Sequence, residues 1–409
     1  MSAKVANGPG ADLAPLQVAG RLDRLRRLFD TAVADTTGAV PAGAVPAGAD
    51  PAVDSTGSVD GVLVTTPANI RWLTGFTGSA GLLLVTRDHA LLTTDGRYRT
   101  QSREQLTAAG VDGSIEITVG GVVAQREALS GGAAGTGVLG LEADHVSWAA
   151  QRSWDELFTG CVLTPTRSLV ERLRTVKDPG EVARMERAAT IADEALGSVL
   201  PLLAAVGSGA DDELSEARFA AALDHAMRLL GAEESAFETI VASGANSAKP
   251  HARPGDRRIR PGDPVVVDFG AVFDGYRSDM TRTFCVGGEP DGELATVFDV
   301  VAVSQRTGVG VVEPGVSTGA VDQACREVIA AAGWAERFEH GTGHGVGLDI
   351  HEGPSVGPGS TAILVPGTVV TVEPGVYLPD TGGVRIEDTL VVTDNGSRPL
   401  TRFPKEVAV

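Results

Sequence analysis

The segment PVVVDFGAVFDGYRSDMTRTFCV, residues 264–286, constrains the fold more than any other part of the chain. Two β-rich runs flank Asp274-Gly275, and this dipeptide between apolar runs is a strong signal for a two-residue hairpin turn. In such a hairpin, Asp268 and Asp279 lie on the same face as diagonal neighbours. Their carboxylates are then close enough to reach one common ion.

The same turn predicts a register for the two strands. With these two residues as the loop, Phe273 pairs with Tyr276 and Asp268 pairs with Thr281. This prediction holds for an ideal hairpin, since a bulge in either strand would change the pairing.

A second pair of acids repeats the pattern near the end of the chain. Glu373 lies in TVVTVEPGVYL (368–378), Glu387 lies in GVRIEDTLVVT (383–393), and turn residues separate the two runs. A carboxylate buried among apolar residues is costly unless a cation compensates its charge. Four acids in otherwise apolar strands therefore predict a bound cation.

The glycine-rich segment HGTGHGVGLDIHEGP (340–354) lies between these hairpins and contains His344. Its glycines let the backbone and the imidazole approach a ligand closely. The four acids supply the charge that two divalent cations need, and neutral His344 adds one nitrogen ligand. This donor set suits Mn²⁺ and tolerates Co²⁺ or Zn²⁺. Two such ions can activate a bridging water and polarise a carbonyl, so the predicted chemistry is metal-assisted hydrolysis.

Composition narrows the choice of partners and compartment. The chain has 409 residues, with 53 Asp and Glu against 34 Lys and Arg, a formal net charge of −19. This balance disfavours binding to nucleic acid or to an anionic membrane surface. The sequence shows neither a signal peptide nor an apolar run long enough for a membrane span, which predicts a cytoplasmic protein. The three cysteines have no ligand spacing and predict no disulfide framework.

The length predicts more than one domain, and the pattern along the chain suggests two. Residues 1–165 read as a mixed α/β domain, with a flexible insertion at about 31–60 that holds the tandem AVPAG repeat. Residues 166–180 are predicted to be a linker. Residues 181–409 combine helices with antiparallel hairpins, so the predicted class is α+β.

Helix signals in the second domain are clearest at its start. The residues Asp-Pro-Gly-Glu at 178–181 predict an N-cap and capping box, and the helix is expected to run to about 199, before Pro201. Two further helices are predicted at about 211–230 and 318–332. Strands are predicted to dominate the remainder of the chain from 237 onward.

The chain resembles the pita-bread metallopeptidases, in the branch of aminopeptidase P, prolidase and creatinase, over about residues 60–400. NIRWLTGFTGS (69–79) and TTDGRYRTQ (93–101) look like the N-terminal domain of that branch, which simple methionine aminopeptidases lack. The ligand order Asp, Asp, His, Glu, Glu is complete in this sequence. The matching residues are Asp268, Asp279, His344, Glu373 and Glu387.

The resemblance also implies a role for each site residue. Asp268 would hold one metal, Asp279 and Glu387 would bridge both, and His344 and Glu373 would complete the other. Glu373 would also carry a proton to the prolyl nitrogen. Three further residues are implied to act on the substrate backbone, the tetrahedral intermediate or the acidic cluster: His251, His351 and Arg385. A homodimer is a further expectation from the resemblance.

Three neighbouring residues allow more than one interpretation. His340 precedes His344 by four residues, but the intervening glycines argue against a helical two-histidine metal motif. A second-sphere or substrate-side role is the preferred interpretation of His340. Tyr377 is expected either to approach the leaving group or to pack, and Cys285 to be a small buried hydrophobic residue.

The resulting hypothesis is an exopeptidase that cleaves between an N-terminal residue and a penultimate proline. Within the branch, an Xaa-Pro aminopeptidase is preferred and an Xaa-Pro dipeptidase (prolidase) is the close alternative, because the motif GTGHGVGLDIHEGP occurs in both. Two remote alternatives are a creatinase-like hydrolase that needs no metal and a catalytically silent peptide-binding module. The presence of all five ligands disfavours both.

Overall fold

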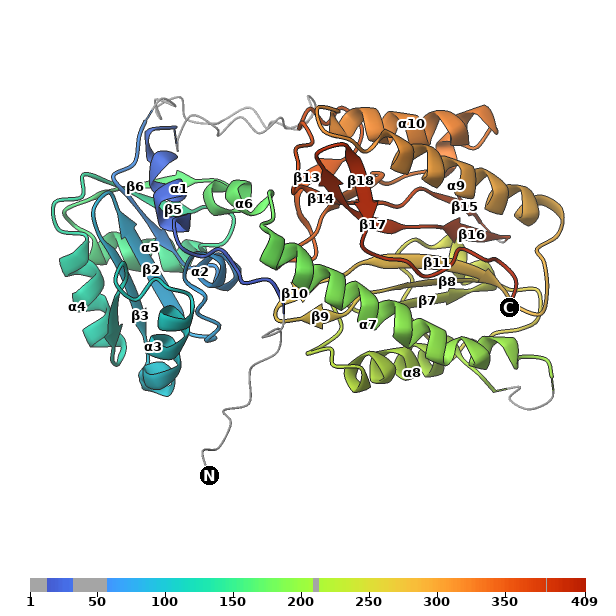
Figure 1. Ribbon diagram of the computed structural model, residues 1–409, viewed down its shortest axis with the longest axis horizontal. Coiled ribbons are helices and arrows are strands. Elements are labelled where there is room, and N and C mark those ends of the chain that lie inside the picture. The colour runs from blue at the N-terminus through green and yellow to red at the C-terminus, as the bar shows by residue number, and fades with distance from the viewer. Residues whose placement is uncertain (1–12, 32–56, 209–212, 380) are drawn as a thin grey trace. The chain divides into compact units, whose positions relative to one another are not determined.

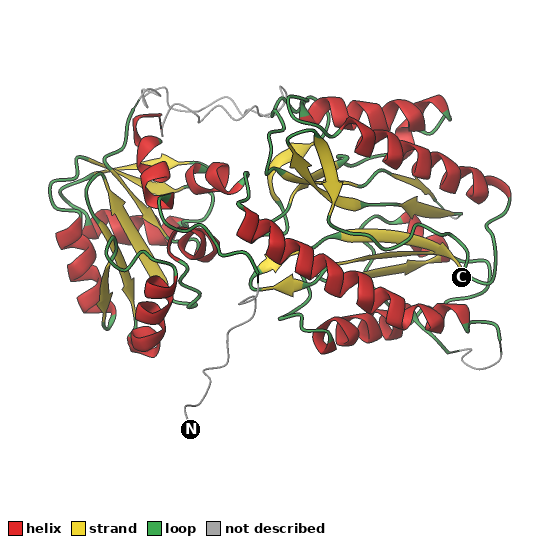
Figure 2. Cartoon of the chain, in the orientation of Figure 1, coloured by secondary structure: helices red, strands yellow, loops and turns green. Residues whose placement is uncertain are grey.

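The computed structural model describes residues 13–31, 57–208, 213–379 and 381–409. It divides into two compact units (Figures 1 and 2). The first comprises Leu16–Arg174, and the second comprises Thr175–Val409 with the described part of residues 1–15. The AVPAG repeat and most of the predicted insertion lie outside the described residues. Among the described residues, no helix has the length and apolar composition needed to cross a membrane.

The first unit is built on a six-stranded mixed sheet in the order β4-β3-β2-β1-β5-β6. Pairs β1–β2 and β2–β3 are antiparallel, and the other three are parallel. The strands are β1 Gly61–Val64, β2 Gly81–Thr86, β3 Ala90–Thr94, β4 Glu116–Val119, β5 Val138–Glu142 and β6 Val162–Thr166. The helices are α1 Arg21–Arg27, α2 Pro67–Thr74, α3 Arg99–Ala108, α4 Val122–Gly132, α5 Trp148–Leu157 and α6 Leu169–Arg174.

Three apolar runs of the sequence form buried strands in this unit. β1, β2 and β3 come from GVLVTT, SAGLLLVT and HALLTTD. Their leucines pack with residues of α4 and β5 in one core, which includes Leu63, Leu84, Leu91, Leu129 and Leu139. The boundary between the units falls after Arg174, within residues 166–180, and that segment includes α6.

The second unit has strands between two pairs of helices, and Figure 1 shows α7 and α8 on one side and α9 and α10 on the other. The helices are α7 Pro179–Ala204, α8 Glu216–Leu229, α9 Gly292–Val311 and α10 Thr318–Ala331. The strands are β7 Ile240–Ser243, β8 Pro264–Phe269, β9 Val272–Phe273, β10 Tyr276–Arg277, β11 Met280–Cys285, β12 Gly343–Gly345, β13 Glu352–Val356, β14 Val369–Val372, β15 Gly375–Leu378, β16 Gly382–Arg385, β17 Asp388–Thr393 and β18 Gly396–Pro399. This helix-and-sheet arrangement is the pita-bread architecture.

Each helix pair covers its own set of strands. α7 and α8 share a core with β8 and β11, to which Leu196, Phe219 and Phe284 contribute. α9 and α10 share a second core with β14 and β17, to which Val297 and Val370 contribute. The sheets are β11-β8-β7 and β13-β12-β14-β17-β18, with the two-stranded pairs β9–β10 and β15–β16. The strands packed against α7 and α8 thus lie next to the strands packed against α9 and α10, between the two pairs of helices.

The predicted hairpin register is confirmed. Phe273 pairs with Tyr276 at the turn, and Asp268 pairs with Thr281 in the β8–β11 ladder. Asp274 has φ 45° and Gly275 has φ 70°, the left-handed pair of conformations that a type I′ turn needs. The short turn matches the twist of the strands and keeps Asp268 in the expected register.

The start of α7 is also confirmed, because the Asp178 side chain caps the helix and Glu181 completes the capping box. The predicted end at about 199 was wrong. Pro201 lies inside the helix, which continues to Ala204. A proline in the last turn removes only one backbone hydrogen bond, and burial of Val199 and Leu203 against the core keeps the turn helical.

Helix α9 was missed by the sequence analysis. Its residues GELATVFDVVAVSQRTGVGV are rich in β-branched valine, which favours strands in isolation. The structure buries Val297, Phe298 and Val301 against α10 and the neighbouring strands. This tertiary packing outweighs the weak local preference.

Candidate active site

All eight residues singled out by sequence line one cavity of about 650 Å³ in the second unit. They are His251, Asp268, Asp279, His344, His351, Glu373, Arg385 and Glu387. The same cavity is lined by His340 and by residues that the sequence analysis did not single out, among them Phe237, Glu238 and Arg253. Only the fold could identify these three, because they carry no motif of their own.

The proposed ligands lie on or beside strands that come together from distant parts of the chain. Asp268 is on β8 and His344 is the central residue of β12, whereas Asp279 immediately precedes β11. Glu373 follows β14 and Glu387 precedes β17. The Glu387 amide donates to the Thr281 carbonyl at 3.1 Å, which holds the start of β17 beside β11.

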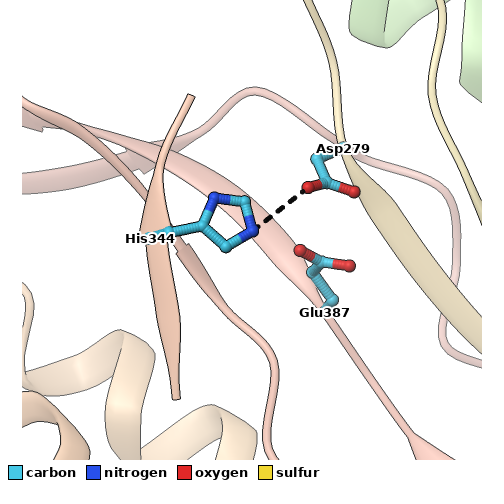
Figure 3. Close-up of side chains that lie close together, drawn as sticks. All are labelled: Asp279, His344 and Glu387. Atoms are coloured by element: carbon cyan, nitrogen blue, oxygen red, sulfur yellow. Dashed lines mark ion pairs between the residues drawn. The ribbon is translucent and has the colours of Figure 1, made fainter. Parts of the chain in front are cut away.

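Three of these side chains form a compact group. Donor atoms of Asp279, His344 and Glu387 all lie within 4.8 Å of one another, and Figure 3 shows the two carboxylates facing the same imidazole edge. His344 Nε2 lies 3.5 Å from an oxygen of Asp279 and 3.5 Å from an oxygen of Glu373. Asp268 is outside the group of three, although it lines the same cavity.

The tautomer of His344 suits a ligand. Its Nδ1 lies 2.9 Å from the Gly345 carbonyl oxygen, which can only accept a hydrogen bond. Nδ1 therefore carries the proton, and Nε2 directs its lone pair towards the carboxylates. Burial also lowers the pKa of His344 to about 4, so the ring is neutral at physiological pH.

Two carboxylate oxygens of the site lack a donor among the described residues. Glu387 Oε2 accepts from the Thr281 hydroxyl at 2.8 Å, and Asp268 Oδ2 accepts from Arg385 at 2.7 Å. Glu387 Oε1 and Asp268 Oδ1 are buried without a hydrogen-bond partner in the described part of the chain. Such orphaned anionic oxygens are costly, and a hard divalent cation is the partner they fit.

Electrostatics leads to the same conclusion. Burial raises the pKa of Glu373 to about 8, and burial followed by neighbouring acids raises the pKa of Asp279 and Glu387 well above their ordinary range. Several carboxylates that repel one another in a dry cavity cannot all be ionised without compensation. A cation would restore the ionised forms, so the residues present fit a divalent metal centre.

A second ring of polar groups supports the acids. Arg385 is buried and donates to Asp268, to the Tyr377 hydroxyl at 2.8 Å and to the Pro250 carbonyl at 3.2 Å. His340 Nε2 lies 2.8 Å from the same Tyr377 hydroxyl. The sequence predicted Tyr377 either to pack or to approach the leaving group. Its hydroxyl lies between Arg385 and His340, so it belongs to this polar ring.

The remaining predicted residues lie around the group of acids. His351 makes an edge-to-face contact with His344, with ring centroids 4.5 Å apart. His251 follows Pro250, whose carbonyl Arg385 fixes. Cys285 is buried on β11, which confirms its interpretation as a small packing residue. Thr281 was not recognised as a partner of Glu387, although its position opposite Asp268 in the hairpin could have suggested a place in the site.

Comparison with known proteins identifies both units. The model of metallopeptidase family M24 matches residues 183–394, and that of the creatinase/prolidase N-terminal domain matches residues 55–176. An uncharacterized peptidase of Bacillus subtilis, YqhT, is 41% identical over 351 residues, which cover 86% of this chain and 96% of the relative.

Solved structures agree with this assignment. The Xaa-Pro dipeptidase from Bacillus anthracis matches with a TM-score of 0.83 and 34% identity, over 96% of this chain and all of the other. The X-Pro aminopeptidase from Thermotoga maritima matches with a TM-score of 0.77 and 32% identity, over 86% and 98%. Divalent metal ions, which the family implies, suit the donor set described above. The chain belongs to metallopeptidase family M24 and carries the creatinase/prolidase type of N-terminal domain.

Proposed function

We propose that this protein is a metal-dependent Xaa-Pro exopeptidase that acts foremost on Xaa-Pro dipeptides. The observation that carries the proposal is the cavity in which one buried carboxylate oxygen each of Asp268 and Glu387 has no donor in the part of the chain that the structure describes. The sequence favoured an aminopeptidase over a dipeptidase. The match to the Bacillus anthracis Xaa-Pro dipeptidase now supports the dipeptidase, and the Thermotoga maritima aminopeptidase keeps the other reaction as the second candidate.

The proposed metal ligands are those that the sequence singled out. Asp268, Asp279, His344, Glu373 and Glu387 would hold two divalent ions, with Mn²⁺ as the first choice and Co²⁺ or Zn²⁺ as substitutes. Bound ions would supply Lewis-acid polarisation of the scissile carbonyl.

The chain's own residues would perform the remaining steps. Glu373 would deliver a proton to the prolyl nitrogen, and its carboxylate lies 3.5 Å from His344 Nε2 within the group of proposed ligands. His251 and His351 line the cavity and would donate hydrogen bonds to the substrate carbonyl and to the developing oxyanion. Arg385 would keep Asp268 ionised and oriented through their 2.7 Å hydrogen bond.

Two further properties belong to the proposal. The resemblance to the prolidase branch supports a homodimer, and the second property is the cytoplasmic location predicted from the sequence. The acidic composition also disfavours a nucleic-acid or membrane-surface partner. Size-exclusion chromatography with light scattering tests the first property at micromolar protein concentration.

Matched substrates test the proposed reaction. The protein is stripped with a chelator and reloaded with Mn²⁺, and kcat/KM is measured for Xaa-Pro, Xaa-Pro-Xaa and Xaa-Ala peptides. We expect hydrolysis only after reloading, with Xaa-Pro preferred over both others. A preference for Xaa-Pro-Xaa would establish the aminopeptidase instead, and undiminished activity in the stripped protein would refute the metal mechanism.

A further inference from the structure

Helix α10 carries a partly buried ion pair that has not entered the proposed reaction. Asp322 and Arg326 lie one turn apart on this helix, and Arg326 Nε donates to Asp322 Oδ2 at 2.8 Å. The Asp322 side chain is only 3% exposed. A pair with this spacing contributes only a few tenths of a kcal/mol to an isolated helix, so helix stability alone does not account for burying it.

Both residues direct their remaining hydrogen bonds at one segment, Phe338–Thr342. Asp322 Oδ1 accepts from the Thr342 amide at 3.2 Å and from its hydroxyl at 2.8 Å. Arg326 donates to the Phe338 carbonyl at 2.9 Å and also to the His340 carbonyl. Its guanidinium lies over the Phe338 ring, 4.3 Å from the centroid. The Arg326 guanidinium and the Asp322 carboxylate thus hold the backbone at Phe338, His340 and Thr342.

The segment leads directly into the active site. His340 lines the cavity and contacts the Tyr377 hydroxyl. The Thr342 carbonyl accepts from the Glu373 amide at 2.8 Å. His344 follows two residues later on β12. A displacement of this segment would therefore shift His340, Glu373 and His344 together.

We propose that Asp322 and Arg326 are positioning residues for the hydrolytic reaction, acting through the backbone of residues 338–342. Their effect on rate rests on the proposed peptidase function, whereas their effect on the segment does not. Charge-assisted hydrogen bonds suit this role because they are directional, and those between Asp322 and Thr342 are buried, where such bonds are strong. Misplacing catalytic groups by about 1 Å can cost about 100-fold in rate.

The same helix provides a matched control. Gln323 and Glu327 have the same spacing and are joined by a 2.7 Å hydrogen bond, but both are exposed. No hydrogen bond recorded among the described residues joins this pair to residues 338–342. Glu327→Met therefore removes a comparable interaction from α10 without reaching the active-site segment.

Steady-state kinetics on an Xaa-Pro dipeptide with Mn²⁺-loaded protein tests the proposal. We expect Arg326→Met to lower kcat by about 10- to 100-fold with little change in KM. Arg326→Lys should recover only part of this loss, because an ammonium cannot reproduce the fork. Asp322→Asn keeps an oxygen for Thr342, so it should lose less than Asp322→Ala. Glu327→Met should match the wild type.

Amide hydrogen exchange gives a readout that needs no substrate. Faster exchange at the Thr342 and Glu373 amides in Arg326→Met, but not in Glu327→Met, would support positioning. A variant that unfolds at lower temperature but keeps the wild-type kcat and exchange at both amides would overturn it. If the wild type cleaves no Xaa-Pro peptide, the proposed function fails, and the exchange data still decide whether the ion pair holds the segment.

Discussion

Each unit of the molecule places a glutamate beside a sheet strand, and the two glutamates have opposite environments. Glu142 ends β5 in the first unit and accepts from the Thr65 amide at 2.6 Å, the Thr66 amide at 2.8 Å and the Asn69 side chain at 2.7 Å. In the second unit, Glu387 has one hydroxyl donor and a buried oxygen with none among the described residues.

Glu142 is therefore a structural acid, whereas the environment of Glu387 suits an acid that binds a cation. Local donors pay the desolvation cost of Glu142, so its carboxylate joins β5 to the start of α2. Glu387, Asp279 and Asp268 line one cavity, and Glu387 and Asp268 each keep a buried oxygen without a donor among the described residues. Burial of an acid is therefore less informative than the number of donors aimed at it.

The largest expected effect comes from removing Glu387. Glu387→Ala should abolish turnover, with a loss well above the roughly 100-fold that changes to outer-shell partners cause. Proline release from an Xaa-Pro dipeptide measures the loss. Glu142→Ala serves as the comparison and should keep most activity at a temperature where it is folded. Near-normal turnover in Glu387→Ala would mean that the wrong acids have been assigned.

A change of pH should have an intermediate effect, on the affinity of the site for Mn²⁺. The pKa of Glu373 is raised to about 8, so below pH 8 the metal-free site holds a proton that an incoming cation must displace. Affinity for Mn²⁺ should rise between pH 6 and pH 8, by up to about tenfold per pH unit for each proton released. Calorimetry in two buffers of different ionisation enthalpy counts these protons.

The same raised pKa fixes the sign of the stability change. Protonated Glu373 stabilises the metal-free fold relative to the ionised form. This contribution is complete below the pKa of Glu373 in the unfolded state and is lost as pH rises through about 8. The unfolding temperature of the stripped protein should therefore fall as pH rises through about 8. The fall should be smaller after Mn²⁺ is added. Glu142→Gln should show the same pH slope as the wild type; a flattened slope would place the titrating group in the first unit.

The smallest effect concerns stability alone. Glu142→Ala leaves several donors without an acceptor and should destabilise the protein by about 1–3 kcal/mol. Urea unfolding followed by circular dichroism measures this change. Glu127→Ala, an exposed acid on α4, is the control and should lie within about 0.5 kcal/mol of the wild type. Equal losses in both variants would contradict a special role for Glu142.

Predictions from sequence succeeded where short-range geometry decides the outcome. The Asp274-Gly275 turn fixed the pairing of Asp268 with Thr281, and the capping box fixed the start of α7. Predictions failed where packing overrides local preference. The valine-rich α9 is helical because the core buries one side of it, and α7 continues through Pro201 for a similar reason.

Which acids and histidines the chain offers, and in what order, follows from the sequence alone. The hairpin that carries the two aspartates also follows from the sequence, because its turn is a property of neighbouring residues. Which oxygens of the acids receive a hydrogen bond depends on the packing of distant segments, since the Thr281 hydroxyl donates to Glu387 across 106 residues of chain. That packing likewise decides that α10 holds the segment before His344. Such contacts depend on how distant elements pack, which residue spacing does not encode.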